Sequence, residues 1–425
     1  MKRLLVFFGL LLFASPAHAT IAVYPSLAAA PSTTATNYRA LLSGTGSFNS
    51  TESNRYQLAG IEGTYIKLSV VLDTAPENGA GTQSYTFTVR SGVSDTATTC
   101  TISESATSCT STTESSMGVG DRISLSCAPS ASAPAASALT FSIAIASTTV
   151  GQSSISAGTG TVNIATGATN YISPHTVSTP TTTEKFVEML IPTSGTFSGL
   201  RVRLSGSPNN GGGTQTYTFT VRRGVGTGAM ADTSVTCAIS ETATTCNDLS
   251  NSFTVAAGDR ITISSAPTAG TPTARLAWFG LIFTSDVDGE FIVPFETDNA
   301  PSTVAVNYDP ADGSGSTWTA TETAVDQHVG YPFTVTAIYV NVDVAPDLGV
   351  GVQSYDYTLR TNDTTDTTAT CNMSETNTTC SLTGLSVSLV ATDLIDTEAT
   401  PNVVPTAPTS QSISYLGFIT PRRIW

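Results

Sequence analysis

Cysteine is the residue type whose spacing carries the clearest chemistry in this sequence. Of seven cysteines, six form three Cys-x8-Cys pairs, Cys100/Cys109, Cys237/Cys246 and Cys371/Cys380. Zinc binding is the alternative to disulfide formation, but this spacing without a partnering histidine is a poor zinc pattern. We therefore predict three disulfides, each across a hairpin with a two-residue turn such as Glu104-Ser105. Facing cysteines on adjacent antiparallel strands are close enough to bond.

Patterns that signal catalysis are sparse. The chain has three histidines, and beyond the N-terminal segment only His175 and His328 remain. We find no G-x-S-x-G, H-E-x-x-H, EF-hand, P-loop or dinucleotide-binding motif. His328 stands in Asp326-Gln-His-Val-Gly330 and is expected in a surface loop. The sequence thus offers no catalytic residue and no metal ligand, and we expect no cofactor.

One carboxylate recurs at each cysteine-flanked turn: Glu104, Glu241 and Glu375. These side chains could form a ligand or Ca²⁺ contact that is repeated in each copy, or they could be solvated residues at the tips of turns. Calcium takes six to eight oxygen ligands, which one carboxylate per turn cannot supply. The turn-tip interpretation is therefore favoured.

One arginine also recurs, as Arg90, Arg222 and Arg360, at the end of the most regular strand of each copy. In a chain with few bases, these arginines could grip an anionic glycan. A structural ion pair with a nearby acid such as Asp121 or Asp259 is the favoured alternative. Exposed aromatic platforms for glycans are not evident. Trp278 and Tyr415 occupy matching sites in the last strands of their copies and are expected to be sheet residues.

Internal repetition organises these residues into three copies. The run GTQSYTFTVR (81–90) returns as GTQTYTFTVR (213–222) and, more loosely, as GVQSYDYTLR (351–360). The repeat length of about 135 residues is that of a domain and exceeds the 20–50 residues of a solenoid unit. We predict a first domain at 20–148, a second at 149–286 and a third at 287–425.

Each copy has the pattern of β-strands. Tyr85, Phe87 and Val89 alternate with polar residues, which places three apolar side chains on one face of a strand. Clusters of glycine, asparagine and proline separate such segments. The sequence therefore predicts an all-β chain of three tandem homologous β-sandwich domains, with a jelly roll as the best single topology.

The remaining cysteine, Cys127, has Ser265 and Ala399 at the matching positions of the other copies. A leftover cysteine in an exported protein suggests an interchain bridge or an unpaired thiol. Alternation places Cys127 on the apolar face of its strand with Ile123 and Leu125. We predict a buried, unpaired thiol.

Together these motifs carry a resemblance. The run G-x-Q-[ST]-Y-T-F-T-V-R, a cysteine-flanked segment and then AAGDRITI (256–263) are similar to a repeat of uncharacterised exported and phage-associated bacterial proteins. The Gly-Asp entry to a late strand also resembles the C1q/TNF-like jelly roll. The resemblance implies a β-sandwich used for binding or assembly, and it carries over no catalytic or ligand residue. The third copy departs from it, with Thr392-Asp393 in place of Gly-Asp.

The N-terminus and the charge indicate location and partners. Lys2 and Arg3, an apolar segment and the small-x-small site Ala17-His18-Ala19 predict a signal peptide at 1–19. The formal net charge of −15 argues against nucleic acid as a partner. No later segment is apolar enough to be a transmembrane helix. We expect a secreted, extracellular or cell-surface protein, with the periplasm as an alternative.

Three functions are compatible with these features. The favoured one is a non-enzymatic structural or adhesive protein, a short rod of three sandwiches that binds a protein or glycan surface or self-associates. The second is an array of carbohydrate- or receptor-binding modules, which could derive from a phage. A pocket shared by all three copies would favour this function. The third is an acid-pair hydrolase, which needs two carboxylates about 5–10 Å apart in a cleft.

Overall fold

The computed structural model describes residues 18–42, 47–79, 81–212, 214–268, 271–297, 299–312, 318–347, 351–420 and 422–423. These residues form strands and three short 3-10 helices, and among them no helix is long and apolar enough to cross a membrane. The first 17 residues, most of the predicted signal peptide, lie outside this set. The chain is all-β, as the alternating patterns predict.

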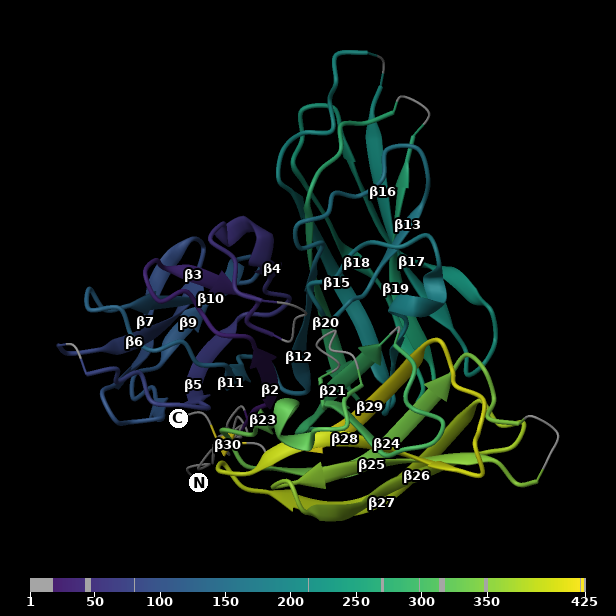
Figure 1. The fold of residues 1–425 in the computed structure, drawn as a ribbon. Helices are drawn as coiled ribbons and strands as arrows, with labels where there is room; N and C mark the ends of the chain where they lie inside the picture. Colours follow the sequence, from purple (N-terminus) through teal and green to yellow (C-terminus); the bar gives the residue numbers. More distant parts are fainter. Residues whose placement is uncertain are drawn as a thin grey trace, which may run out of the picture.

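Each third of the chain contains the same succession of elements (Figure 1). The first domain contains β2 (Ile21–Ala28), β3 (Asn37–Arg39), η1 (Glu52–Arg55), β4 (Gln57–Leu58), β5 (Gly63–Leu72), β6 (Ser84–Ser91), β7 (Ser94–Ser103), β8 (Ser108–Thr110), β9 (Ser115–Met117), β10 (Arg122–Pro129) and β11 (Leu139–Ser147). In the second domain they are β12 (Gln152–Gly158), β13 (Asn170–Ile172), η2 (Glu184–Val187), β14 (Met189–Leu190), β15 (Gly195–Leu204), β16 (Thr216–Gly224), β17 (Met230–Ser240), β18 (Thr245–Val255), β19 (Arg260–Pro267) and β20 (Ala277–Ser285). The third domain has β21 (Glu290–Thr297), β22 (Asn307–Pro310), η3 (Glu322–Ala324), β23 (Gln327–His328), β24 (Phe333–Val342), β25 (Ser354–Thr361), β26 (Thr365–Ser374), β27 (Thr379–Leu389), β28 (Leu394–Asn402) and β29 (Gln411–Phe418).

The strand order in each domain is that of a jelly roll. In the second domain one sheet runs β12-β20-β15-β18 and the other β13-β19-β16-β17, with β14 also pairing β19. The first and last strands are thus neighbours in one sheet, and the second and second-last are neighbours in the other. The other two domains repeat this order, so that six antiparallel sheets form three two-sheet sandwiches.

Alternation along the strands fills the space between the sheets. On β6, Tyr85, Phe87 and Val89 are fully buried, whereas Thr86 and Thr88 face outward. The outward hydroxyls pair with Thr101 and Thr99 of β7 at 3.0 Å. Every second residue therefore enters the core, while the outer face is a ladder of threonines.

The cysteine pairs join two sheets and do not face each other across one hairpin. The structure bonds Cys100 to Cys109, Cys237 to Cys246 and Cys371 to Cys380, with Cα–Cα distances of 5.7–5.9 Å. In the second domain, β17 pairs β16 in one sheet, while β18 pairs β15 in the other. The expected single-sheet hairpin is wrong, because the preferred partners of the two strands lie in opposite sheets. Each disulfide thus fastens the two sheets at one edge of the sandwich.

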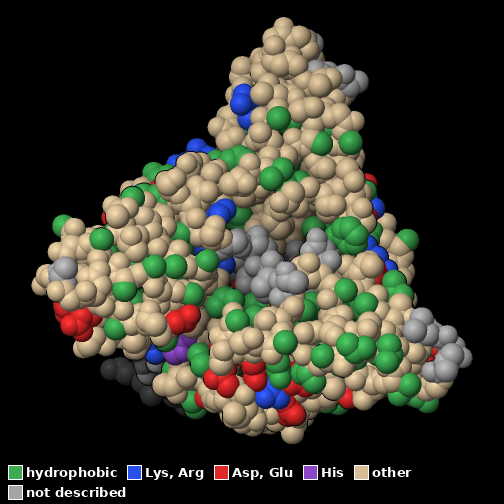
Figure 2. Space-filling model, in the orientation of Figure 1, with side chains coloured by type: hydrophobic (Ala, Val, Ile, Leu, Met, Phe, Trp, Pro, Cys, Tyr) green, Lys and Arg blue, Asp and Glu red, His purple; other side chains and the backbone are tan. Residues whose placement is uncertain are grey.

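The three domains close into a ring, and the expected rod is wrong. Figures 1 and 2 show three lobes around a common centre. The edge strand β4 of the first domain contacts β12 and β20 of the second, β14 of the second contacts β21 and β29 of the third, and β23 of the third contacts β2 and β11 of the first. Each edge lies on the next domain's face, and the third contact returns to the first domain. A rod would leave one edge and one face uncovered.

The two ends of the described chain also meet. A two-residue strand β1 (His18–Ala19) pairs antiparallel with β30 (Arg422–Arg423). Predicted signal cleavage after Ala19 places β1 on the removed side.

Candidate functional site

Each domain has an equivalent arginine cluster on the sheet that contains β6, β16 or β25. The arginine of each cluster pairs with acids of its own domain. In the second domain Arg222 binds Glu184 of η2 at 2.6 Å and also pairs with Asp232 of β17. Its guanidinium lies over the ring of Tyr171, 5.7 Å from the centroid. Thr262 of β19 donates to the same Glu184 at 2.7 Å. The arginine therefore joins strand, 3-10 helix and neighbouring strand into one unit.

The first domain repeats this cluster and shows that the expected partner was wrong. Arg90 binds Glu52 at 2.5 Å and also pairs with Asp95, above the ring of Tyr38. Asp121, the expected partner, instead accepts from the Ser91 hydroxyl at 2.8 Å. In the second domain the corresponding Asp259 binds Arg223 at 2.6 Å. The partners of Asp121 and Asp259 are therefore Ser91 and Arg223. Each of these residues directly follows the recurrent arginine and lies on the opposite face of the strand.

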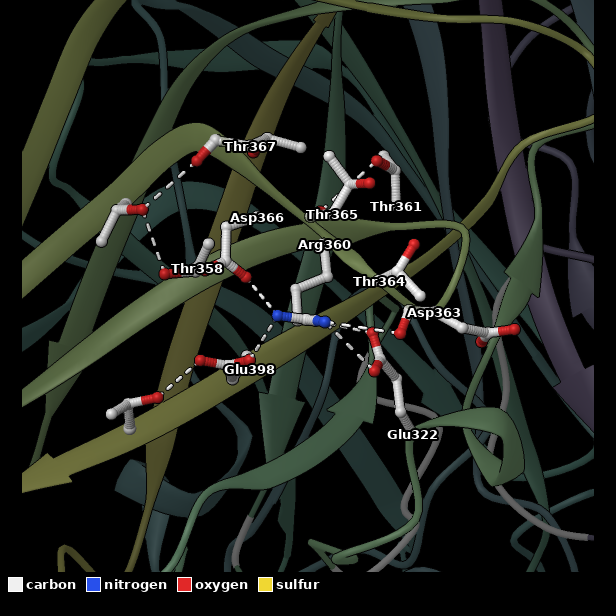
Figure 3. Close-up of polar contacts among 12 residues, drawn as sticks. Glu322, Thr358, Arg360, Thr361, Asp363, Thr364, Thr365, Asp366, Thr367 and Glu398 are labelled. Carbon is white, nitrogen blue, oxygen red and sulfur yellow. Dashed lines mark hydrogen bonds and ion pairs between the residues drawn. The ribbon is translucent and has the colours of Figure 1, made fainter.

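In the third domain the same arginine has an additional acidic partner. Arg360 binds Glu322 at 2.6 Å and Glu398 at 2.8 Å, and it also pairs with Asp366 (Figure 3). Its side chain is only 12% exposed. With acids on several sides, these guanidinium groups have little surface left for a glycan, so the structural interpretation fits all three.

Further carboxylates surround this third cluster, and two of them, Asp363 and Asp396, have no acidic counterpart in the other domains. The third-domain carboxyl cluster consists of Glu322, Asp326, Asp363 and Asp396. By strand register Asp396 stands where Ser124 and Thr262 stand in the other domains. Ser124 and Thr262 donate a hydrogen bond to the equivalent glutamate, which a carboxylate cannot do.

Burial makes this cluster electrostatically unusual. Asp396 is 0% exposed, and neither of its carboxylate oxygens accepts from an N–H or hydroxyl donor, while its carboxyl lies within hydrogen-bonding reach of the Glu322 carboxyl. Burial, followed by the charge of Glu322, raises the pKa of Asp396 to about 8. Burial and the neighbouring Asp363 raise the pKa of Asp326 well above its usual range. No three His, Cys, Asp or Glu side chains in the described part of the chain are arranged to hold a metal ion.

The seams between domains are the second set of repeated polar contacts. At the second-to-third seam, the hydroxyls of Ser412 and Ser414 each donate at 2.6 Å to carbonyls of the neighbouring edge, those of Glu188 and Leu190. At the first-to-second seam, Trp278 Nε1 donates to the carbonyl of Ser53 at 3.1 Å.

Strand register corrects the expected match between Trp278 and Tyr415. Trp278 pairs with Arg203 of β15, and the residue at the same register in the third domain is Ser412. Tyr415 is instead a core residue whose hydroxyl bonds Thr397 at 2.7 Å. Trp278 is a seam residue that is 3% exposed, and it is not available as a glycan platform.

His328 lies in the third-to-first seam, and its expected place in a surface loop is wrong. It belongs to β23, is 8% exposed, and its Nε2 lies 2.9 Å from the Ser69 hydroxyl of the first domain. Its backbone N–H donates to Thr140 Oγ1 at 2.7 Å. Burial, and then the charge of Lys67, lower the pKa of its imidazole.

Two of the three turn glutamates, Glu104 and Glu241, bind the backbone of their own domains. Glu104 has a positive φ of 53° and its carboxylate accepts the backbone N–H of Gln83 at 2.8 Å. Glu241 does the same with Gln215 at 2.8 Å. The carboxylate therefore ties the turn to the start of the neighbouring strand, a role that neither the ligand nor the turn-tip interpretation included.

Cys127 lies between the two sheets. It is 0% exposed and forms no disulfide. Burial raises the pKa of its thiol well above the ordinary range. A thiol in this state is a poor nucleophile.

Two of the clefts lie at seams and one lies within the third domain, and no two are lined by equivalent residues. A cleft of about 410 Å³ lies at the third-to-first seam, lined by Lys67, Ser69, Val71, Thr107, Ser108, Thr110, His328, Gly330, Ala391, Thr392 and Leu394. One of about 480 Å³ borders Phe333 and Phe418, and one of about 160 Å³ borders Arg55 and Val177. A cavity of only about 10 Å³ lies where the three domains meet, beside His175, whose pKa burial lowers to about 3.

Comparison with known proteins adds no relative: no family model matches this chain, and no curated protein matches its sequence.

Proposed function

We propose that this chain is an exported, non-enzymatic structural or adhesive component, built as a ring of three jelly rolls in one polypeptide. The closed set of edge-on-face seams is the observation that carries the proposal. In an array of independent binding modules, each domain would keep its faces free. Here each domain uses an edge and a face to hold its neighbours, so the ring is the unit.

The distribution of charge supports the same function. The recurrent arginines and the turn glutamates Glu104 and Glu241 bind partners inside their own domain. The outer faces present hydroxyl ladders such as Thr86–Thr101 and Thr88–Thr99. Such a surface suits contact with a protein or glycan surface over a broad area. We also propose that the domains are relatives of the C1q/TNF-like jelly roll, on the basis of strand order and the Gly-Asp strand entry.

The location test is immunogold electron microscopy of intact and permeabilised cells with an antibody against the ring. We expect labelling of the surface of intact cells, and no labelling of a strain that lacks the gene. Labelling seen only after permeabilisation, with the protein recovered by osmotic shock as a freely soluble species, would refute a surface structural role.

A glycan-binding function is the second candidate, favoured by the cleft at the third-to-first seam. Its hydroxyls and Lys67 suit an acidic saccharide, with the ammonium group facing the sugar carboxylate. Binding to an array of acidic glycans that Lys67→Ala abolishes would support it. Lys185→Ala is the charge-matched control, because Lys185 contacts the Asp343 carbonyl elsewhere. An acid-pair hydrolase has no such support, since none of the clefts described above is lined by Asp or Glu.

A further inference from the structure

The third-domain carboxyl cluster has more acidic residues and fewer basic residues than the equivalent sites of the other two domains. Asp326 stands where the other domains have Tyr56 and Glu188, and in the second domain Glu188 is neutralised by Arg260. Leu394 stands where Arg122 and Arg260 stand. The same framework therefore holds more carboxylates around one guanidinium group, that of Arg360.

The charged groups facing the cluster come from every neighbouring element. They are Glu322 on η3, Asp326 before β23, Arg360 on β25, Asp363 in the following turn, Asp366 on β26, and Asp396 and Glu398 on β28. The titratable hydroxyls of Tyr308 on β22 and Tyr415 on β29 also face the cluster. Arg360 is the only cation that pairs with these carboxylates in the described part of the chain. It forms ion pairs with Glu322, Glu398 and Asp366. Its charge also acts on Asp396, but Asp326, Asp363 and Asp396 form no ion pair among the described residues.

Unpaired carboxylates close together in a buried site share protons, because two like charges there repel each other in a medium of low dielectric constant. Asp396 is fully buried and has no donor for either oxygen, and Asp326 Oδ1 and Asp363 Oδ1 also lack a donor. The neighbours within hydrogen-bonding reach are themselves carboxyl groups, Glu322 for Asp396 and Asp363 for Asp326. A proton between neighbouring carboxyl groups supplies the missing donor.

The cluster is attached directly to the seam that closes the ring. Asp326 precedes β23, whose His328 contacts Ser69 and Thr140 of the first domain. The next turn of this edge is tight, since a Cβ on Gly330 would lie 1.8 Å from Ser142 Oγ. Movement of Asp326 away from its acidic neighbours would displace this edge.

We propose that the third-domain carboxyl cluster is a proton-dependent latch that holds the third-to-first seam closed and loosens it as its shared protons are lost. The folded chain holds protons that the unfolded chain releases at acid pH. Stability from the latch is therefore complete only below the ordinary carboxyl pKa of about 4, and it declines as pH rises from there through the neutral range to the folded-state pKa of Asp396, about 8. His328 acts in the opposite direction, because its protonation in acid must disrupt its buried contact. The range from about pH 6.5 to 9 isolates the carboxyl effect.

The experiment measures urea unfolding and hydrogen exchange of the full chain across that pH range. Each proton held only by the folded state raises the unfolding constant by about tenfold per pH unit. In the wild-type protein we expect the unfolding constant to rise with pH by up to this factor for each such proton. Hydrogen exchange of the segment around Gln327 and His328 should become faster over the same range. Infrared absorption of protonated carboxyl groups should be present at pH 7 and disappear by about pH 9.

Two variants and one control locate the effect. Asp396→Ser restores the hydroxyl of the first domain and should flatten the pH dependence and remove part of the infrared band. Asp326→Tyr, which restores the residue of the first domain, is the second test if Asp396→Ser does not fold. Asp366→Ser removes an acid that is 65% exposed on the same arginine and should leave the pH dependence unchanged.

Three results would overturn the proposal. One is an unchanged pH dependence in both cluster variants that fold, and another is the absence of the carboxyl band at pH 7 in wild type. The third is loss of the wild-type pH dependence on addition of calcium chloride, which would show that the cluster binds a cation in place of shared protons.

Discussion

Cys127 shows how a single residue can be chemically inert because of its strand position. Its side chain lies between the sheets, and the equivalent residues Ser265 and Ala399 are also small and almost fully buried. We expect one thiol to react with an alkylating reagent only after denaturation without reductant. Cys127→Ala should change the free energy of unfolding by less than about 1.5 kcal/mol, because alanine occupies the same site in the third domain. A native dimer on non-reducing electrophoresis, abolished by Cys127→Ser, would contradict this.

The arginine clusters give a second prediction at this scale. Arg222→Met leaves Glu184, which is 16% exposed, with only its hydroxyl donor. We expect a loss of about 2 kcal/mol in the free energy of unfolding, because an acid in a largely buried site loses its base. Asp232→Asn is the matched control, since that aspartate is 66% exposed and should change stability by less than about 0.5 kcal/mol. Equal effects of the two substitutions in urea unfolding would show that the cluster is not structural.

At the scale of elements, the seams depend on close backbone approach. A Cβ on Gly60, beside β4, would lie 1.9 Å from the Leu281 carbonyl oxygen of β20. The same holds in the opposite direction, because a Cβ on Gly280 of β20 would lie 2.8 Å from the Leu58 carbonyl oxygen of β4. We expect Gly60→Ala to separate edge from face and to cost about 2 kcal/mol or more. Gly167→Ala is the control, because nothing lies within 4 Å of its Cβ position. Hydrogen exchange of β4 should increase in the first variant alone, and unchanged exchange would refute the close-contact argument.

Elements of each domain could be predicted from the sequence, whereas their assembly could not. The alternation of Tyr85, Phe87 and Val89 determines which face is buried whatever the partner, so strands and sandwiches follow from period alone. The Cys-x8-Cys spacing permits bonding either across one sheet or between two sheets, and only strand pairing decides between them. The seams escaped prediction because their signal is only a short edge strand followed by Gly60, Pro192 or Gly330, a pattern that is equally typical of an ordinary turn. The acidic cluster is visible only when three domains are aligned by register.

At the scale of the whole molecule, three similar domains assemble in one order. In the first domain Gly60 fits under the Leu281 carbonyl, but the second domain has Pro192 at the equivalent position. A proline ring cannot occupy a space that excludes even a Cβ. The edge of the second domain therefore does not fit its own face, and the ring cannot be built from three second domains. Such mismatches select the correct neighbour by excluding the wrong one.

The last prediction concerns residues 149–286 expressed alone in the periplasm. This domain has its own hydrophobic cluster, to which the neighbouring domains add only Ile292, so we expect it to fold cooperatively with its disulfide. Because Pro192 prevents self-assembly, it should be monomeric in light scattering at all concentrations. Trp278, the one tryptophan of this segment, packs edge-on against Tyr56 of the first domain at 5.3 Å. Its fluorescence should therefore shift to the red in the isolated domain, and adding the first domain (20–148) should reverse the shift. A trimeric fragment, or one whose tryptophan emission equals that of the full chain, would show that the seams do not define the order of the ring.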